Sequence, residues 1–271
     1  MKPRAVLLNV TVALFAAATL APLLWMLSVS FMQPGEATGT PAPLLPSRPT
    51  LHHYALLFTD YRLARPFLNS LALASTATML SLLMAAPAGY AFAKLRFRGC
   101  ERLLQLLLAA LVIPGQVALL PLFLLMKALG LVDSYAGVLV PSLAGAFAVL
   151  FIRQAALSIP DEMLDAARLD GASELQIFRR IVVPLLRPIL VTLGLFVFLG
   201  SWNDFLWPLI ILADQRLYTL PVALAALSRE YAFETELMMA GAVVTALPPL
   251  LLFLALQRYY VQGILGGGIK G

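Results

Sequence analysis

Two polar residues with the chemistry of a binding site, Asn203 and Asp204, stand inside an apolar run, between Trp202 and Trp207. A carboxylate within a membrane costs roughly 2.5–3.5 kcal/mol on insertion scales, so an acid in such a place indicates a binding or transport role. The alternative is an aromatic belt at the membrane surface, with Asp204 at the depth of the lipid headgroups. The residues alone leave both interpretations open.

The remaining polar candidates are scattered. Asn69 begins a polar edge of Ser and Thr residues, for which helix packing is the simpler role. Gln116 lies between two prolines and either lines a broken helix or packs. His52 and His53 are adjacent, without a nucleophile or a His-Glu-x-x-His spacing beside them, and the chain has no Gly-x-Ser-x-Gly motif. We therefore expect neither a metal site nor catalysis.

The elements that must position these residues are apolar helices. Of the 271 residues, 61% are hydrophobic and 12% are charged, whereas a soluble domain has about a quarter charged. The single cysteine, Cys100, excludes an internal disulfide. The first apolar run is about twice as long as a signal-peptide core, so we expect an uncleaved first helix. Six runs reach the length of a membrane span, near residues 5–31, 66–93, 103–126, 136–157, 185–212 and 238–257.

Basic residues fix the expected orientation. With both termini in the cytoplasm, the inside segments hold 13 of the 19 Lys and Arg residues and the outside segments hold 6. The positive-inside rule favours this arrangement. The polar segment 158–184, between the fourth and fifth spans, is then cytoplasmic. The loops 32–65 and 213–237 are outside, where the second is either a contact for a binding protein or a solvated connector.

The segment 158–184 has the pattern of two short helices joined by a bend. Ser158 is followed by a proline and two acids, which suit a helix N-terminus. Gly171 suits a helix end, and Ser173 with Gln176 forms a capping box for a second helix. The expected faces are Met163, Ala166, Ala167 and Asp170 on the first helix, and Leu175, Phe178 and Ile181 on the second. A solvated loop with helical propensity is the alternative.

This segment resembles the cytoplasmic signature of ABC importer permeases. That pattern is Glu-Ala-Ala, two residues, Asp-Gly-Ala, five residues, Phe, two, Ile, one, Leu-Pro, three, Pro. The matching positions here are Asp165, Ala166, Ala167, Asp170, Gly171, Ala172, Phe178, Ile181, Pro184 and Pro188. Asp165 replaces Glu, and Val183 replaces Leu, and both changes are conservative.

Further stretches are similar to the carbohydrate branch of the same family. They are SWNDFLWPL (201–209), IPGQV (113–117), DSYAG (133–137), QRYYVQG (257–263) and GIKG (268–271). The likeness covers most of the chain and is nearest to the smaller permease subunit of maltose-type oligosaccharide importers. It implies an all-α integral membrane protein with six transmembrane helices, the type I importer permease fold. The whole chain, 1–271, would be one permease domain in the inner membrane of a prokaryote.

The resemblance also implies a mechanism. Segment 158–184 would be the coupling segment between spans 4 and 5, and it would dock in a cleft of an ATP-binding subunit. When two such subunits close on ATP, the docked segment would move with them and switch the spans from inward- to outward-facing. Met163 to Asp170 would be the docking helix, Gly171 would be its bend, and Asp165 and Arg168 would be rim contacts. The second helix, with Leu175 and Phe178, would tie the docking motion to the fifth span. The chain lacks a Gly-x-x-x-x-Gly-Lys-Ser/Thr loop, so ATP and Mg²⁺ would bind to the partner and this chain would hold no cofactor.

The implied partners are a second permease subunit in a heterodimer, two ATP-binding subunits, an extracytoplasmic sugar-binding protein and membrane lipid, without nucleic acid. The sugar path in this chain would involve Trp202 or Trp207, stacked on a pyranose, with Asn203, Asp204, Gln116 and Asn69. The larger permease subunit would supply most sugar contacts. The alternative is a secondary transporter without an ATPase, which predicts ionisable residues in several spans and repeated halves.

Overall fold

The computed structural model describes residues 3–41, 43–143, 145–230 and 234–268, and every regular element in those ranges is a helix. Lys2, Lys270 and the last part of GIKG, used in the sequence analysis, lie outside the described residues. The chain divides into two compact units, Met1–Pro66 with Leu220–Leu250 and Phe67–Thr219 with Leu251–Gly271. Each unit is described by itself.

Helix α1 (Pro3–Val29) of unit 1 is exposed along most of its length. Within the span Leu7–Val29, the most apolar continuous stretch of 18 residues contains no buried residue. Its exposed side chains are mostly apolar. A helix that is apolar all round is a membrane span or a buried core helix. This helix fits the first expected span. The elements of unit 1 are α1 (Pro3–Val29), η1 (Glu36–Thr38), α2 (His52–Thr59), α13 (Leu220–Glu230) and the first part of α14 (Thr235–Gly268).

The two segments expected outside the membrane, 32–65 and 213–237, each contain an α-helix. In segment 32–65, helix α2 buries His53, whose Nε2 lies 3.1 Å from the carbonyl oxygen of Met32. In segment 213–237, eleven residues form α13, since its Leu- and Ala-rich sequence favours helix and outweighs the flanking charges. The sequence analysis treated both segments as loops and predicted neither α2 nor α13.

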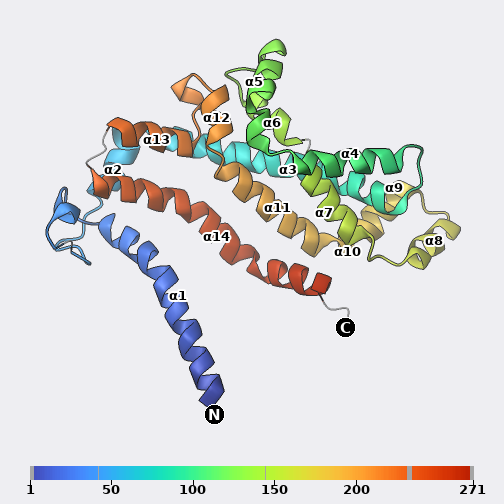
Figure 1. Ribbon diagram of the computed structural model, residues 1–271, viewed down its shortest axis with the longest axis horizontal. Coiled ribbons are helices and arrows are strands. Elements are labelled where there is room, and N and C mark those ends of the chain that lie inside the picture. The colour runs from blue at the N-terminus through green and yellow to red at the C-terminus, as the bar shows by residue number, and fades with distance from the viewer. Residues whose placement is uncertain (1–2, 42, 144, 231–233, 269–271) are drawn as a thin grey trace. The chain divides into compact units, whose positions relative to one another are not determined.

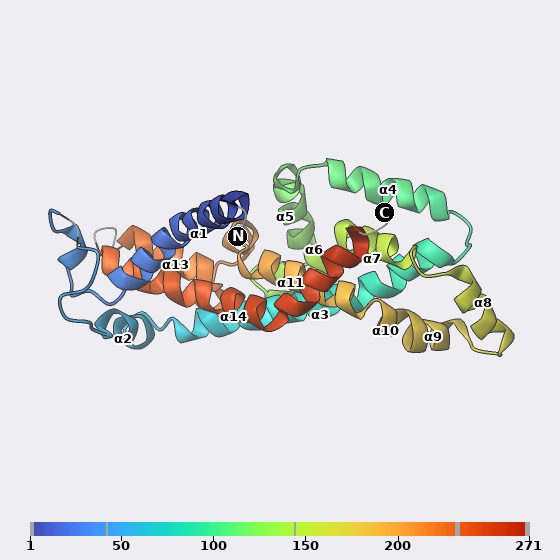
Figure 2. The same ribbon diagram turned by 90° about the horizontal axis from the view of Figure 1, so that it is seen from below.

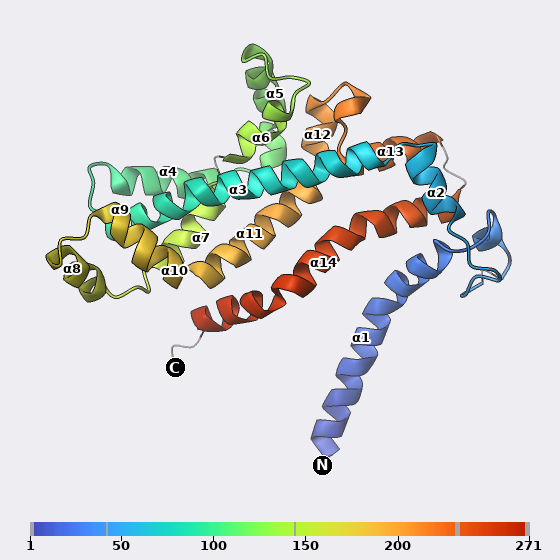
Figure 3. The ribbon, with the colours of Figure 1, turned by 180° about the vertical axis from the view of Figure 1, so that it is seen from behind.

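Unit 2 carries the segments singled out by the sequence. Its short helices α8, α9 and α10 follow one another at one end of α3, and α12 lies toward the other end (Figures 1 and 3). Its elements are most of α3 (Ala64–Lys94), α4 (Cys100–Val112), η2 (Gly115–Ala118), α5 (Leu119–Ala128), α6 (Tyr135–Leu143), α7 (Ala146–Ala156), α8 (Asp161–Leu169), α9 (Glu174–Ile177), η3 (Phe178–Val182), α10 (Val183–Leu185), α11 (Arg187–Trp202), α12 (Leu206–Ile211) and η4 (Gln215–Leu217).

The described residues include four helices long and apolar enough to cross a membrane, or up to six if two bent pairs each count as a span. The four correspond to the first, second, fourth and sixth expected spans. The expected third span is not one straight helix, because α4 and the η2–α5 pair meet at 95° (Figure 2). Ile113 is extended before Pro114, as a residue preceding proline tends to be.

The expected fifth span is also interrupted. The second bent pair joins residues 174–185 to α11 at an angle of 77°. The bend falls at Leu186, between Pro184 and Pro188, where the backbone leaves the helical region. A second break, at residues 203–205, separates α11 from α12. The count of six spans therefore stays a prediction, while the all-helical membrane fold is confirmed.

Helices α3 and α7 pack with little space between their backbones. A Cβ atom on Gly89 would lie 2.6 Å from Cγ2 of Ile152, which is fully buried. This contact belongs to a core shared by α3, α7, α8, η3 and α11. A second core lies near α12 and is formed by Leu73, Met126, Val138, Trp207, Ile211 and Leu212. The two cores position the two candidate sites described next.

Candidate docking segment and polar cavity

Helix α8 begins at Asp161, immediately after Pro160. Asp161 and Glu162 occupy its first turn, where negative charge stabilises the helix dipole. The expected start at Ser158 was wrong, because the Ser158 hydroxyl donates instead to the carbonyl of Ala155 in the preceding helix. The turn that follows α7 uses this hydroxyl, so α8 begins without a side-chain cap.

A lysine at the end of α3 holds the start of α8. The Nζ of Lys94 donates to Oδ1 of Asp161 at 2.7 Å and to the carbonyl of Ile159 at 2.6 Å. The Lys94 side chain is only 6% exposed. Its ammonium group holds the pKa of the Asp161 carboxyl below its usual value, so this carboxylate is charged at physiological pH. The first tie between α8 and α3 is therefore ionic.

Helix α8 ends in a Schellman motif centred on Gly171, as the sequence predicts. The N–H of Ala172 donates to the carbonyl of Ala167, and the N–H of Gly171 donates to that of Arg168, both at 3.0 Å. Gly171 has φ +83°, a conformation that L side chains rarely adopt, although a Cβ there would meet no atom within 4 Å. Glycine is needed here for the backbone and not for space.

Arg168 forms a second tie, which the sequence analysis did not foresee. Its guanidinium donates to Asp165 at 2.6 Å and to Glu174 of α9 at 2.7 Å. The hydroxyl of Tyr90 in α3 donates to the other oxygen of Glu174 at 2.8 Å. These carboxylates raise the pKa of Arg168 further above its usual value. Arg168 thus braces α8 against α9 and α3, and its expected contact with a partner stays a prediction.

The second helix of the segment starts with the expected capping box. Ser173 and Gln176 exchange both side-chain-to-backbone hydrogen bonds. The expected apolar stripe was partly wrong, because Leu175 is exposed and Ile177 is buried. A π-helical turn follows, Phe178–Val182, and its i to i+5 repeat places Ile177 and Val182 in the same core. Phe178 packs against Tyr90, with ring centroids 5.7 Å apart.

The outward side of α8 is exposed and carries apolar side chains among acidic ones. Leu169 is 90% exposed and Met163 is 43% exposed, with Ala166 and Asp170 also exposed. The inward anchor is Leu164, which is 1% exposed. Neither leucine was predicted from the small-residue pattern of this helix, although helical spacing from Leu164 indicates the inward side. Ala167, placed with the open face from sequence, is half-buried against the core.

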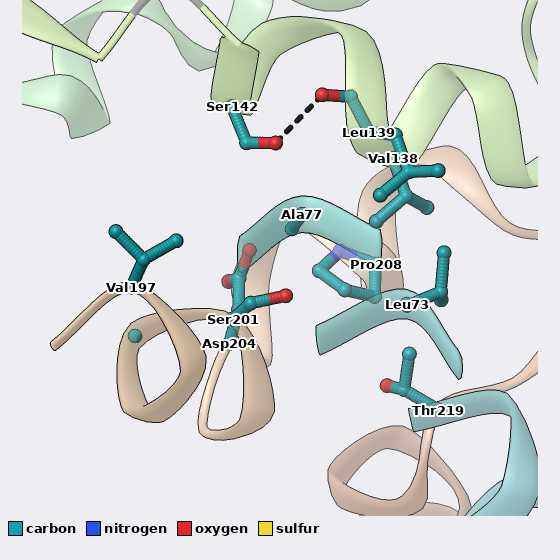
Figure 4. A pocket seen from close by; sticks show the side chains of 11 residues that line it. Leu73, Ala77, Val138, Leu139, Ser142, Val197, Ser201, Asp204, Pro208 and Thr219 are labelled. Atoms are coloured by element: carbon teal, nitrogen blue, oxygen red, sulfur yellow. Dashed lines mark hydrogen bonds between the residues drawn. The ribbon is translucent and has the colours of Figure 1, made fainter. Parts of the chain in front are cut away.

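The second candidate site is a cavity of about 260 Å³. Its polar lining consists of Asp204, Ser201, Ser142 and Thr219, and its remaining walls are mainly aliphatic (Figure 4). Oδ1 of Asp204 accepts a 3.4 Å hydrogen bond from the N–H of Trp207. Asp204 is thus part of a polar cavity, and Ser142, Ser201 and Thr219 are partners that the sequence analysis did not assign. Ser142 and Thr219 lie on other elements than Asp204, so their spacing in the sequence does not indicate that they share a cavity with it.

The two tryptophans expected to stack on a sugar are packing residues in this structure. Trp202 is fully buried between Phe67 and Phe198, with ring centroids 5.7 and 5.9 Å away. Trp207 is 7% exposed, and its Nε1 donates to the carbonyl of Gly137 at 3.0 Å. Neither indole presents a free face, so the stacking role was wrong for this conformation.

The other candidates for the solute path also lie outside the cavity lining. Asn69 donates through Nδ2 to the carbonyls of Arg216 and Tyr218, both at 3.0 Å. Asn203 is exposed and donates to the carbonyl of Leu199 at the end of α11. Gln116 is exposed in the η2 turn between α4 and α5, at the helix break that its flanking prolines predict. A direct solute contact by these residues stays a prediction.

The family described as the binding-protein-dependent transport system inner membrane component matches residues 77–266. The chain belongs to this family. It is therefore a multi-pass inner-membrane permease of an ABC-type transport system, not an enzyme, and it works with an ATPase and a substrate-binding protein.

Individual relatives agree over nearly the full length. The chain is 38% identical to the arabinooligosaccharides transport system permease protein AraQ of Halalkalibacterium halodurans, covering 98% of this chain and 96% of that protein. It is 33% identical to the lactose transport system permease protein LacG of Rhizobium radiobacter, covering 94% and 92%.

The fold also matches a solved structure. That match is a chain in the crystal structure of a bacterial ABC transporter involved in the import of the acidic polysaccharide alginate. The TM-score is 0.82 at 24% sequence identity, with 94% of this chain and 95% of that chain covered. At this identity the match establishes the shared fold alone.

Proposed function

We propose that this chain is one of two different permease subunits of an ATP-driven sugar importer. The full-length relatives named for arabinooligosaccharides and lactose support a carbohydrate substrate. The complex would hold two ATP-binding subunits, with ATP and Mg²⁺ bound there, and an extracytoplasmic sugar-binding protein. The observation that carries the proposal is the exposed apolar face of α8, presented by a segment braced to α3 at two points.

The docking face consists of Met163, Ala166, Leu169 and Asp170. Exposed apolar side chains on a short helix suit the groove of a partner protein. Leu164 anchors the opposite side of α8 in the core of unit 2. A displacement of the docking face by the ATP-binding subunits would therefore move α3, through the two ties, together with η3 and α11. Alternating access would follow from that motion.

The proposed orientation places both termini and α8 in the cytoplasm. The 13 to 6 distribution of basic residues supports it. Within unit 2, α8 and α9 lie at the Lys94 end of α3, where Arg96, Arg98 and Arg102 follow in sequence. The docking face and a basic stretch are thus on the same side, as an ATPase in the cytoplasm requires.

A secondary transporter working without an ATPase was the alternative drawn from the sequence, and the family match argues against it. Its coupling would need ionisable side chains along the solute path. Asp204 meets that condition by lining a cavity, but the exposed docking face would then have no use. The permease function explains both features, and so it is the one we propose.

Copurification tests the proposed function. The tagged chain, extracted from its native membranes in mild detergent, is expected to bring a second permease and an ATP-binding subunit, both identified by mass spectrometry. A parallel extraction from membranes that contain the untagged chain serves as the control for non-specific contaminants. A chain that supports sugar uptake in proteoliposomes as a lone protein or homo-oligomer, without any ATPase, would favour the secondary transporter.

A further inference from the structure

The cavity beside Asp204 contains a buried hydroxyl that the protein leaves unsatisfied. Thr219 is 4% exposed, and its Oγ1 has no hydrogen-bond partner among the described residues. A buried polar group without a partner is destabilising, because its lost hydrogen bonds to water are not replaced. Asn69 holds the preceding backbone in place by donating to the carbonyl of Tyr218, so the position of Thr219 is fixed. A hydroxyl held in this way is suited to a ligand.

The other oxygen atoms of the lining come from separate elements. Ser142 lies on α6 and donates to the carbonyl of Leu139 at 2.6 Å, which leaves its lone pairs to accept. Ser201 ends α11, and Asp204 lies in the break before α12. Figure 4 draws Ser142 at one side of the cavity and Thr219 at the opposite side, with Ser201 and Asp204 between them. The lining therefore offers hydroxyls and one carboxylate around a common space.

The remaining walls are apolar and the size is small. Leu73 and Ala77 of α3, Val138 of α6 and Val197 of α11 contribute aliphatic surface. A volume of about 260 Å³ corresponds to about nine water molecules at about 30 Å³ each, so it far exceeds one ion. Pockets for drug-sized ligands run from about 300 to 1,000 Å³, so this cavity suits a smaller group.

We propose that this cavity binds one ring of the transported sugar, with the Asp204 carboxylate accepting from ring hydroxyls and Thr219, Ser201 and Ser142 completing the hydrogen bonds. The aliphatic walls contact the C–H faces of the ring. This inference rests on the proposed importer function and gives this chain its own part in the sugar path. The contact is made by aliphatic side chains and hydroxyls, without the tryptophans.

Uptake measured against ATP hydrolysis tests the cavity. The full complex, in proteoliposomes with its binding protein, is supplied with radiolabelled trehalose, lactose and arabinobiose. The variants Asp204→Asn and Thr219→Val are expected to lower the uptake of the transported sugar roughly tenfold, as the loss of a hydrogen bond to a bound ligand does. ATPase stimulation by the binding protein is expected to stay within about twofold, since that signal does not pass through the cavity.

Controls separate binding from folding. Thr219→Ser keeps the hydroxyl and is expected to restore uptake, whereas a purely structural role of the methyl group would not allow rescue. Glu101→Gln and Thr11→Val remove a carboxyl group and a hydroxyl from exposed positions on α4 and α1 and are expected to behave like the wild type.

Several results would overturn the inference. Uptake by Asp204→Asn and Thr219→Val equal to that of the controls would show that no sugar ring binds there. An equal fall of uptake and ATPase activity, without rescue by Thr219→Ser, would assign the cavity to packing. If the wild-type complex lacks an ATPase and takes up none of the three sugars, both the importer function and this inference fail.

Discussion

The hydroxyl of Tyr90 donates a 2.8 Å hydrogen bond to the carboxylate of Glu174, 84 residues further along the chain. Tyr90 is 3% exposed within α3, and Glu174 is the first residue of α9. The same carboxylate accepts from Arg168 of α8. One acid thus links the proposed docking helix, the helix after its bend and a membrane-spanning helix.

Removing this link should uncouple transport from ATP hydrolysis. We expect Tyr90→Phe and Glu174→Gln to leave the complex assembled but to lower uptake per ATP hydrolysed several-fold. A hydrogen bond to a charged group contributes about 1.5–3 kcal/mol, and the lower end applies because Glu174 is about half exposed. The measurement is uptake and ATPase activity on the same proteoliposomes.

Tyr54→Phe is the matched control for that test, since it removes a tyrosine hydroxyl that hydrogen bonds to Ser30 in unit 1. It should behave like the wild type. A Tyr90→Phe variant with normal uptake and normal ATPase activity would remove the brace from the mechanism.

Gly171 should be needed for its backbone conformation. A non-glycine residue at φ +83° costs about 1–2 kcal/mol, so Gly171→Val is expected to abolish uptake while membrane insertion remains normal. Gly99→Val is a close control, because Gly99 has φ +85° and equally open space but lies outside the docking segment. Equal uptake by the two variants would count against the special role of the bend.

Gly89 should be needed for space. A side chain there meets Ile152 at 2.6 Å, and overpacking of this kind costs about 1–3 kcal/mol. Gly89→Val is therefore expected to lower the melting temperature of the detergent-purified complex and its yield. Gly115→Val, where a Cβ meets nothing within 4 Å, should leave both unchanged. A normal melting temperature for Gly89→Val would contradict the close packing of α3 and α7.

The apolar part of the docking face should tolerate no added charge. Leu169→Asp is expected to reduce the amount of ATP-binding subunit recovered with the chain roughly tenfold. Docking would bury the Leu169 side chain, which contributes about 1.5–3 kcal/mol, whereas an aspartate there would place a charge in the interface. Leu44→Asp places the same charge on another exposed leucine, in unit 1, and should change nothing. Quantitative mass spectrometry of the copurified subunits gives the ratio. Full recovery with Leu169→Asp would place the ATPase elsewhere.

The sequence predicted what local patterns control. It predicted the two helices of the docking segment, the Gly171 bend and the Ser173–Gln176 capping box, because each depends on residues within one or two turns. It missed the Arg168–Glu174–Tyr90 brace, because that contact joins distant elements. The register of the second helix was also missed, since helical spacing does not reveal a π turn.

The cavity shows the same limit. Asp204 was identified because an acid in an apolar run is conspicuous, whereas Ser142 and Thr219 are ordinary in sequence and converge on it only through the fold. Trp202 was assigned to the solute path by its residue type, but tertiary packing placed it between two phenylalanines. Burial therefore decided the role of Trp202, which its residue type alone did not reveal.

Photo-crosslinking from position 166 tests the docking of α8 most directly. A photoreactive amino acid replaces Ala166, which is exposed at the centre of the docking face, and the membranes are irradiated before extraction. We predict an adduct with the ATP-binding subunit from position 166 and none from a probe at position 44. An intact complex that gives no adduct from position 166, or the same adduct from both positions, would contradict the docking of α8.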